Sequence, residues 1–344
     1  MVAKIPMHIV AINHIKRIAM RCINLSAFSL TSRIASLVVA MSLSSALQAW
    51  TLPVGEFKFE AITDRVFVMH GPRAQPNPQN QGFMNNPALI VGSTGLILID
   101  PGGSLQVGNK ILDEVAKISD KPVIAVFNTH IHGDHWLGNQ AVRNKYPNAD
   151  IYAHANTVTQ ALGSEGETWL ALMSRLTEGK TEGTEIVTAN KTVEHDNRIV
   201  IDGEEFRIHS LLPSHTDSDI MIEHVASRTI FTGDNCSRLR LGRFDGSGSI
   251  IGTIAALEYL LEQNYQLVVP GHGPSGSVSD ALMPYLNYLR ALEAAVAEGQ
   301  EAELEDYEIK QNILPRFAHM THWAEFDSLF GRNVNKMFLE LEAF

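Results

Sequence analysis

The sequence predicts an α+β protein in which two mixed sheets pack face to face and helices cover the outside. Two observations predict this arrangement: after residue 50 the strand-like segments come in groups, with helical patterns between and after them, and the second half of the chain repeats the plan of the first. Because no linker is long enough to demand a second domain, residues 50–344 are expected to form one domain.

In the first half, short apolar runs bounded by turn residues predict strands, at residues 65–70, 88–92, 96–100, 122–127 and 151–153. Apolar side chains recur at helical spacing over residues 105–118 and 156–176, and residues 139–145 can begin a helix. The segment 71–86 is rich in Pro, Gly and amides, and it predicts either a solvated loop or a flap over the substrate.

The second half predicts a meander of strands followed by a helix and one more strand, at residues 198–201, 204–212, 219–224, 229–232, 250–262 and 266–269. The remainder is predicted to be helical, at residues 279–298, 304–314 and 323–341. This helical extension, about 279–344, could cover one sheet, seal a pocket or form a dimer contact. The sequence leaves the oligomeric state open.

The first 49 residues differ from the rest of the chain. They contain five basic residues and no acidic ones, an apolar run over residues 34–47, and small residues near Ala49. This pattern predicts a cleaved signal peptide over residues 1–49 and a periplasmic or secreted protein without a membrane anchor. A membrane anchor is the alternative, and translation could begin at Met1 or Met20.

Charge and cysteine content limit the possible partners. The formal net charge of −11 becomes −16 without residues 1–49, so the surface would repel phosphates and no nucleic-acid partner is expected. Cys22 lies in the leader, which leaves Cys236 unable to form an internal disulfide. We expect Cys236 to be buried or close to a site without contacting a metal.

The central motif spans residues 128–135 and reads Asn-Thr-His-Ile-His-Gly-Asp-His. Three imidazoles and a carboxylate so close together, directly after a buried strand, cannot be explained by amphipathicity. A tight loop can turn His130 and His132 toward one metal and Asp134 and His135 toward another, with backbone freedom at Gly133. Nitrogen and oxygen ligands without thiolates suit zinc, iron or manganese and argue against a purely structural zinc site.

Three more blocks place candidate ligands just beyond predicted strands. His215 lies in Ser-His-Thr, Asp234 in Thr-Gly-Asp and His272 in Pro-Gly-His-Gly. In this order, the four blocks resemble the metallo-β-lactamase superfamily over most of the chain. The resemblance implies an αββα sandwich.

It also implies a ligand set. His130, His132 and His215 would hold one metal, and Asp134, His135 and His272 a second. Asp234 would bridge the two metals, and Asp100 would support the loop without being a ligand. The implied cofactors are two divalent ions, with zinc expected from geometry and family, and iron or manganese as alternatives.

The resemblance implies a metal-dependent hydrolase that acts on a small molecule. A hydroxide shared by the two metals would attack an electrophile, and Asp134 would orient it and carry its proton. The bridging aspartate resembles glyoxalase II more than β-lactamases. An Asn/Gln-rich segment before Asn85 and residues 331–335 resemble exported zinc hydrolases of sulfur-oxidation and quinoprotein relay systems.

Three functions stay open from sequence. The first is an exported hydrolase of a thioester, ester or lactone. The second is a periplasmic β-lactamase, against which Asp234 counts because an added carboxylate weakens attraction for the carboxylate of the drug. The third is a non-catalytic metal-binding accessory protein of an exported redox system.

Overall fold

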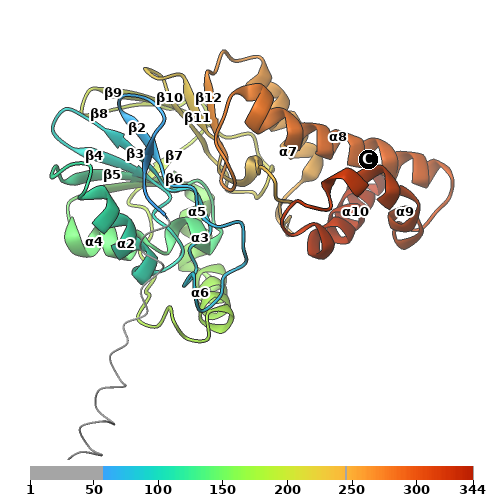
Figure 1. Ribbon diagram of the computed structural model, residues 1–344, viewed down its shortest axis with the longest axis horizontal. Helices are drawn as coiled ribbons and strands as arrows, with labels where there is room; N and C mark the ends of the chain where they lie inside the picture. The colour runs from blue at the N-terminus through green and yellow to red at the C-terminus, as the bar shows by residue number, and fades with distance from the viewer. Residues whose placement is uncertain (1–56, 245, 344) are drawn as a thin grey trace, which may run out of the picture. The chain divides into compact units, whose positions relative to one another are not determined.

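The computed structural model describes residues 57–244 and 246–343, so the predicted signal peptide lies outside the described residues. Two mixed sheets and the surrounding helices are seen in Figure 1. The α+β architecture predicted from sequence is therefore confirmed. No described helix is both long enough and apolar enough to cross a membrane.

Seven described strands form the first sheet, in chain order: β1 (Glu60–Ala61), β2 (Val66–Val68), β3 (Ala88–Val91), β4 (Leu96–Ile99), β5 (Val123–Phe127), β6 (Asp150–His154) and β7 (Lys191–Val193). The strands β1 to β4 are antiparallel, and β4 to β7 are parallel. Parallel neighbours need a crossover, which is supplied by α2 (Leu105–Val115), α4 (Asn139–Lys145), and the pair α5 (Ala155–Leu162) and α6 (Ser164–Leu176).

Five described strands form the second sheet: β8 (Arg198–Ile201), β9 (Glu204–His209), β10 (Met221–His224), β11 (Thr229–Phe231) and β12 (Leu267–Val269). The strands β8 to β11 are an antiparallel meander, whereas β11 and β12 are parallel and joined through α7 (Ile250–Leu261). The carboxyl ends of β5, β11 and β12 carry six of the seven candidate ligands, and His215 lies in the segment between β9 and β10.

Side chains that alternate between the two faces of a strand divide the core into layers. On β4, Ile97 and Ile99 face the second sheet and meet Phe206 and Phe231 there. Leu96 and Leu98 point the other way, toward α2 and α4. Each of these fully buried side chains stabilises the fold by about 1.5–3 kcal/mol, so the packing of sheet on sheet fixes the edge where the ligands gather.

The C-terminal segment is helical, as predicted, with α8 (Met283–Glu301), α9 (Asp306–Ile313) and α10 (Phe326–Glu342). Its apolar faces share one buried cluster with α7 and with Val268 and Ile230 of the second sheet. Figure 1 shows these helices grouped beside α7, away from α2 and α4. The extension therefore covers the second sheet.

The helix predicted over residues 156–176 is two helices instead, because Gly163 is extended, with φ −94° and ψ −159°. A Cβ at Gly166 would lie 2.1 Å from the carbonyl oxygen of Ala161, so the chain packs tightly just after the break. The short strands β1 and β7 also went unpredicted, because a few largely exposed residues give little apolar pattern.

The start of α7 is capped from a distant helix. The Glu340 carboxylate of α10 accepts hydrogen bonds from the backbone N–H groups of Ile250 and Ile251, at 2.9 and 3.0 Å, and from the Ser249 hydroxyl at 2.9 Å. These are N–H groups that no residue within α7 can satisfy. The contact ties the last helix of the chain to the helix beside the second sheet.

We expect Glu340→Ala to lower the free energy of unfolding by about 1–2 kcal/mol, because the substitution leaves helix-terminal donors without their charged acceptor. Denaturant unfolding monitored by circular dichroism measures the change. Glu342→Ala, at an exposed position of the same helix, is the matched control and should have little effect. Equal unfolding midpoints for the two variants would contradict the proposed cap.

Candidate metal centre

The motif loop leaves β5 and turns into a short helix, α3 (Gly133–Trp136). Asn128 and Asn139 pair through their side-chain amides at 2.8 and 3.0 Å, and the Trp136 indole donates to the Ile131 carbonyl at 2.6 Å. These contacts fix the loop from both ends. As a result, His132 precedes the helix while Asp134 and His135 lie in its only turn.

Gly133 has a different role from the one expected. Its φ is not positive, so the turn does not need the conformational freedom of glycine. A Cβ at this position would instead lie 3.0 Å from Trp169 of α6 and from Leu137. Glycine at this position allows the close approach of α3 and α6.

The second sheet supplies the other three candidates. His215 lies between β9 and β10, Asp234 in a single 3₁₀ turn, η1 (Gly233–Asn235), after β11, and His272 just after β12. The N–H of Gly271 donates to the Gly233 carbonyl at 2.8 Å, and a Cβ on Gly271 would fall 2.0 Å from the carboxylate of Asp234. Only glycine lets the two strand ends approach this closely.

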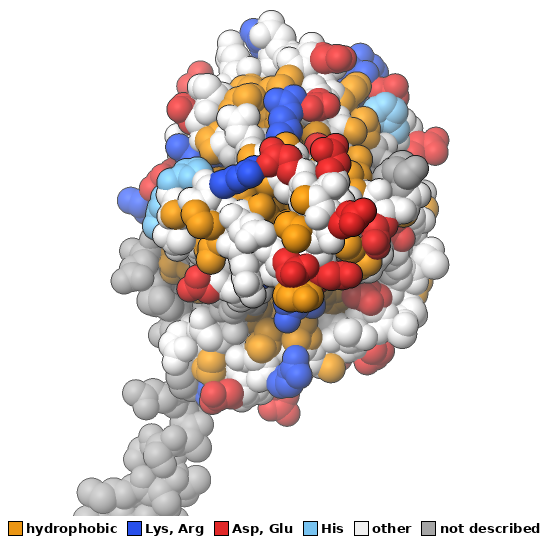
Figure 2. All heavy atoms as spheres, turned by 90° about the vertical axis from the view of Figure 1, so that its right-hand side faces the viewer, with side chains coloured by type: hydrophobic (Ala, Val, Ile, Leu, Met, Phe, Trp, Pro, Cys, Tyr) orange, Lys and Arg blue, Asp and Glu red, His pale blue; other side chains and the backbone are white. Residues whose placement is uncertain are grey.

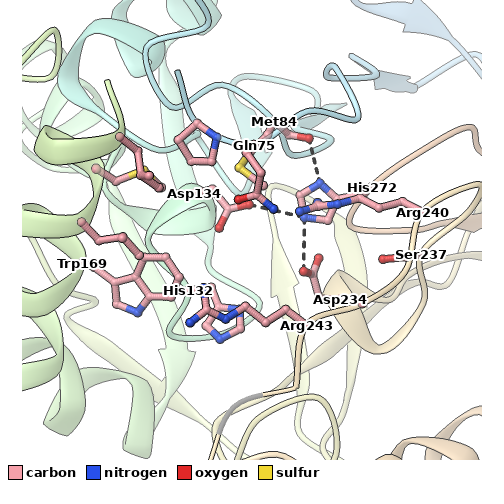
Figure 3. A pocket seen from close by; sticks show the side chains of 15 residues that line it. Gln75, Met84, His132, Asp134, Trp169, Asp234, Ser237, Arg240, Arg243 and His272 are labelled. Atoms are coloured by element: carbon pink, nitrogen blue, oxygen red, sulfur yellow. Dashed lines mark hydrogen bonds and ion pairs between the residues drawn. The ribbon is translucent and has the colours of Figure 1, made fainter. Parts of the chain in front are cut away.

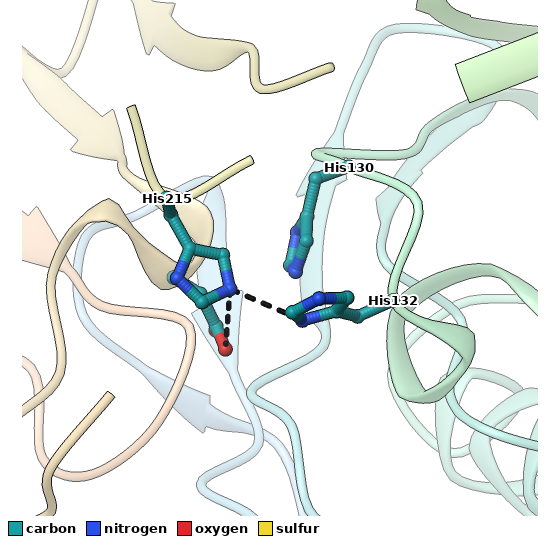
Figure 4. A group of neighbouring side chains, drawn as sticks. His130, His132 and His215 are labelled. Atoms are coloured by element: carbon teal, nitrogen blue, oxygen red, sulfur yellow. Dashed lines mark hydrogen bonds and ion pairs between the residues drawn. The ribbon is translucent and has the colours of Figure 1, made fainter. Parts of the chain in front are cut away.

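The first group of side chains comprises His130, His132, His215 and Asp234, whose ligand atoms lie within 4.8 Å of one another. Figure 4 shows the three imidazoles directed toward a common point. His132 Nδ1 lies 3.1 Å from His215 Nε2, which lies 3.7 Å from Asp234 Oδ2. The group contains the three histidines that the sequence assigns to one metal.

The second group comprises Asp134, His135 and His272. Asp134 Oδ2 lies 3.3 Å from His135 Nε2 and 3.4 Å from His272 Nε2. Asp234 contacts this group too, with Oδ1 3.3 Å from His135 Nε2 and Oδ2 3.2 Å from His272 Nε2. Because Asp234 touches members of both groups, its position is the one that a bridging carboxylate requires.

Three contacts at Nδ1, on the side away from the centre, orient the imidazoles. Asp100 accepts from His135 Nδ1 at 2.7 Å, the Met84 carbonyl accepts from His272 Nδ1 at 2.8 Å, and the Thr129 hydroxyl lies 2.9 Å from His130 Nδ1. Each contact leaves the Nε2 atom facing the centre. Asp100 is therefore a supporting residue, as expected.

The segment 71–86 is not a solvated loop, because its second half is buried. Gln75, Pro76 and Met84 of this segment line the pocket beside the candidate ligands, as expected of a segment that covers the substrate. The Asn86 amide donates to the carbonyls of Pro270 and Gly273, at 2.8 and 2.7 Å, on either side of His272. Sequence reasoning did not find Met84 or Asn86 as site residues. The run of amides at residues 77–86 was the available signal.

The groups fit metal ions. His130 Nε2, His135 Nε2, Asp134 Oδ2 and Asp234 Oδ1 are buried and make no hydrogen bond of proper geometry. Burial lowers the pKa of His130 well below its usual value, and the neighbouring imidazoles lower it further, so His130 presents a neutral nitrogen. Such orphaned buried atoms are costly unless a cation satisfies them.

The carboxylates are also in the form that binds metal. Burial alone would raise the pKa of Asp134 and Asp234, but His135 and His272 outweigh it and hold both values well below the usual range. Burial likewise opposes protonation of His135, yet Asp134, Asp234 and Asp100 raise its pKa well above the usual value. Without a cation the His135 proton offsets the buried carboxylates, and a metal ion would replace that proton.

Four of the candidate ligands open onto one pocket (Figure 3). Trp169, Leu172, Met173 and Leu176 of α6 form an apolar wall. His132, Asp134, Asp234 and His272 lie along the pocket, and Arg240 and Arg243 follow on the chain segment after η1. The pocket can therefore hold a small molecule that is partly apolar and bring it to the ligand groups.

Two other features lie apart from this centre. Cys236 is fully buried, with Sγ 3.4 Å from the Ala281 carbonyl oxygen, and burial raises the pKa of its thiol. His195, Asp196 and His209 also lie close together, but Asp196 binds Arg207 at 2.7 Å and His209 lies 3.1 Å from the Glu223 carboxylate. Protein side chains already bind Asp196 and His209.

Comparison with known proteins identifies the family. The sequence model of the metallo-β-lactamase superfamily matches residues 81–272, which include every candidate ligand. The chain belongs to the metallo-β-lactamase superfamily. It is a metal-dependent hydrolase of that superfamily, with histidine and aspartate groups able to bind metal ions.

Relatives agree with this assignment. A probable metallo-hydrolase of Streptococcus pyogenes is 27% identical over 203 residues, 56% of this chain and 81% of that protein. A hydroxyacylglutathione hydrolase of Synechococcus is 26% identical over 168 residues, 48% of this chain and 54% of that protein. The fold resembles a sec-alkylsulfatase from Pseudomonas, with a TM-score of 0.65 at 18% identity, over 84% of this chain and 50% of the other.

We expect Asp100→Asn to weaken metal binding by about 10- to 100-fold, because it removes the carboxylate that orients His135. Competition with a fluorescent zinc chelator measures the affinity. Asp113→Asn, on the exposed face of α2, is the control and should bind zinc as the wild type does. An unchanged affinity in Asp100→Asn would show that His135 needs no such partner.

We expect Cys236→Ser to keep the metal content of the wild type, because the thiol lies outside both ligand groups. The hydroxyl is smaller and more polar than the buried thiol, so a loss of stability of about 1 kcal/mol is expected instead. Elemental analysis and thermal unfolding test the two statements separately. Loss of one metal equivalent would place Cys236 in the ligand set.

Proposed function

We propose that the protein is an exported hydrolase that uses two metal ions, most readily zinc, to cleave a thioester, ester or lactone. The observation that carries this proposal is the position of Asp234, in contact with His215 of one ligand group and with His135 and His272 of the other. A carboxylate that contacts both ligand groups is placed to bind two cations rather than a single cation. Export is inferred only from the first 49 residues.

In this proposal His130, His132 and His215 would hold one ion, Asp134, His135 and His272 the other, and Asp234 both. The ions would supply Lewis acidity, which polarises a carbonyl oxygen and lowers the pKa of water toward about 7. Zinc suits a site of imidazole and carboxylate groups without thiolates, and iron or manganese would suit the same atoms.

The protein residues position the substrate and transfer the proton of the attacking water. Asp134 lines the pocket, where its carboxylate can accept a proton from the attacking water and return it to the leaving group. His135 and His272 outweigh burial and hold the pKa of Asp134 well below its usual range, so the carboxylate is ionised before the reaction. The apolar wall of α6 excludes water from the acyl part of the substrate.

The similarity to a hydroxyacylglutathione hydrolase supports the cleavage of a thioester or a related acyl bond. The alternative functions are a β-lactamase and a non-catalytic accessory protein, and one experiment distinguishes all three. The test measures zinc, iron and manganese in the purified protein, together with hydrolysis of a thioester, an ester, a lactone and a chromogenic cephalosporin. About two metals per chain with turnover of an acyl ester, thioester or lactone supports the proposal.

Turnover of the cephalosporin alone would replace this proposal with a β-lactamase. Two bound metals without turnover of any of these compounds would favour the accessory role. Detection of the mature protein, starting near Trp50, in the exported fraction of the cells that make it tests export separately. Retention of residues 1–49 in the cytoplasm would contradict export.

We expect Asp134→Asn to lower kcat by about 100- to 10,000-fold, because the amide cannot accept the proton of the attacking water. Steady-state hydrolysis of the best substrate gives kcat, and elemental analysis shows how much metal the variant retains. Asp64→Asn, at an exposed position, is the control. Wild-type turnover in Asp134→Asn would exclude the proposed proton transfer.

A further inference from the structure

One arginine of the pocket is buried without a partner. Arg240 is only 6% exposed, and its Nε and Nη1 atoms are buried and have no hydrogen bond. Other arginines in the described residues behave differently: Arg198, Arg290 and Arg316 lie near the surface and each pairs with a glutamate. Burying a guanidinium without an anion costs free energy, and a bound anionic ligand would offset that cost.

The side chain of Arg240 points into the pocket of the metal centre. Figure 3 shows it extending toward His272 and Gln75, while Arg243 extends toward His132 from the same segment. The two guanidinium groups therefore lie beside the candidate ligands, across the pocket from the apolar wall of α6. A guanidinium offers several donors in one plane and suits the paired oxygens of a carboxylate or a sulfate.

The backbone holds Arg240 in this position. The preceding residue, Leu239, has a φ of +56°, which is unfavourable for a branched side chain. The Leu239 carbonyl accepts from Ala324 N at 2.9 Å and from Arg73 Nη1 at 3.0 Å, and Leu241 N donates to the Ala324 carbonyl at 3.0 Å. A strained backbone that is anchored on both sides is typical of functional sites, where it fixes the direction of a side chain.

A second anchor lies on the helical extension. The Asn333 amide of α10 donates to the Gly242 carbonyl at 3.2 Å and to the Tyr288 hydroxyl at 3.0 Å. The C-terminal segment thus holds the residues on both sides of Arg240. The backbone that carries Arg240 is preorganised, which lowers the entropic cost of binding a ligand.

The charge around the pocket contrasts with that of the surface. The chain carries a net charge of −11, and Figure 2 shows many acidic side chains on the face seen from the right of Figure 1. An anion would gain little from such a surface. Within the pocket, Arg240 and Arg243 lie near the carboxylates of Asp134 and Asp234, and cations held by the ligand groups would offset those carboxylates and leave the arginines to favour an anion.

We propose that Arg240 binds an oxyanion group of the substrate, a carboxylate or a sulfate, while the apolar part of the substrate lies against α6. The inference rests on the proposed function, because it places the substrate of that same site. It makes Arg240 a specificity-determining residue that selects anionic over neutral substrates. Arg243, which is exposed, assists from the rim of the pocket.

A matched pair of substrates tests this selection. The probes are 4-nitrophenyl hydrogen glutarate and 4-nitrophenyl valerate, which share a leaving group and chain length and differ in the terminal charge. In the zinc-loaded full-length protein, Arg240→Gln should lower kcat/KM for the glutarate ester by about 10- to 100-fold, mainly through KM, because it loses hydrogen bonds to a charged group. The valerate ester should change by less than about threefold.

Two further variants serve as references. Arg240→Lys keeps the positive charge and should recover part of the selectivity for the glutarate ester. Arg290→Gln removes a surface arginine of α8 that pairs with Glu258, and it should leave both esters unchanged. Equal losses on the two esters in Arg240→Gln, or no loss on the glutarate ester, would overturn the inference.

Binding provides a readout that does not depend on turnover. Isothermal titration of hexanoate, hexyl sulfate and hexanol into wild type and Arg240→Gln, at equal measured zinc content, should show at least one anion bound about tenfold more weakly by the variant. The anion whose affinity falls more in the variant shows whether Arg240 prefers a carboxylate or a sulfate. Equal binding of both anions by the two proteins would overturn the inference, even if neither ester is hydrolysed and the proposed acyl hydrolysis fails.

Discussion

The burial of two carboxylates among five imidazoles is the constraint on which the rest of the structure depends. Asp134 and Asp234 are each less than one-tenth exposed, and the histidines around them are buried as well. Charges removed from water in this way are tolerable only where each has a fixed partner and a cation to share. The two sheets, the short helix α3 and the close approaches at Gly133 and Gly271 all provide that fixed arrangement.

Much of the site could be predicted from the sequence, because metal ligands must come in particular residue types at strand ends. The motif at residues 128–135 and the isolated His215, Asp234 and His272 named all seven side chains that the structure gathers into two groups. Their roles as ligands stay predictions. The grouping of strands and helices was predictable too, since buried strands and amphipathic helices have distinct periods.

The rest could not be predicted, because it depends on contacts between distant segments. The carbonyl of Met84 behind His272 is a backbone group, and any residue could supply it. Nothing in the sequence places Glu340 at the start of α7, 90 positions away. The break at Gly163 and the steric role of Gly133 likewise follow from how helices approach one another, which a single sequence does not state.

The division of the ligands between the two sheets has a consequence for the order of folding. The first sheet brings His130, His132, Asp134 and His135, and the second brings His215, Asp234 and His272, so neither half contains a whole site. A metal ion held by ligands of both halves would join two layers that form from separate stretches of chain. Metal binding would then require that the two layers have docked in the correct register.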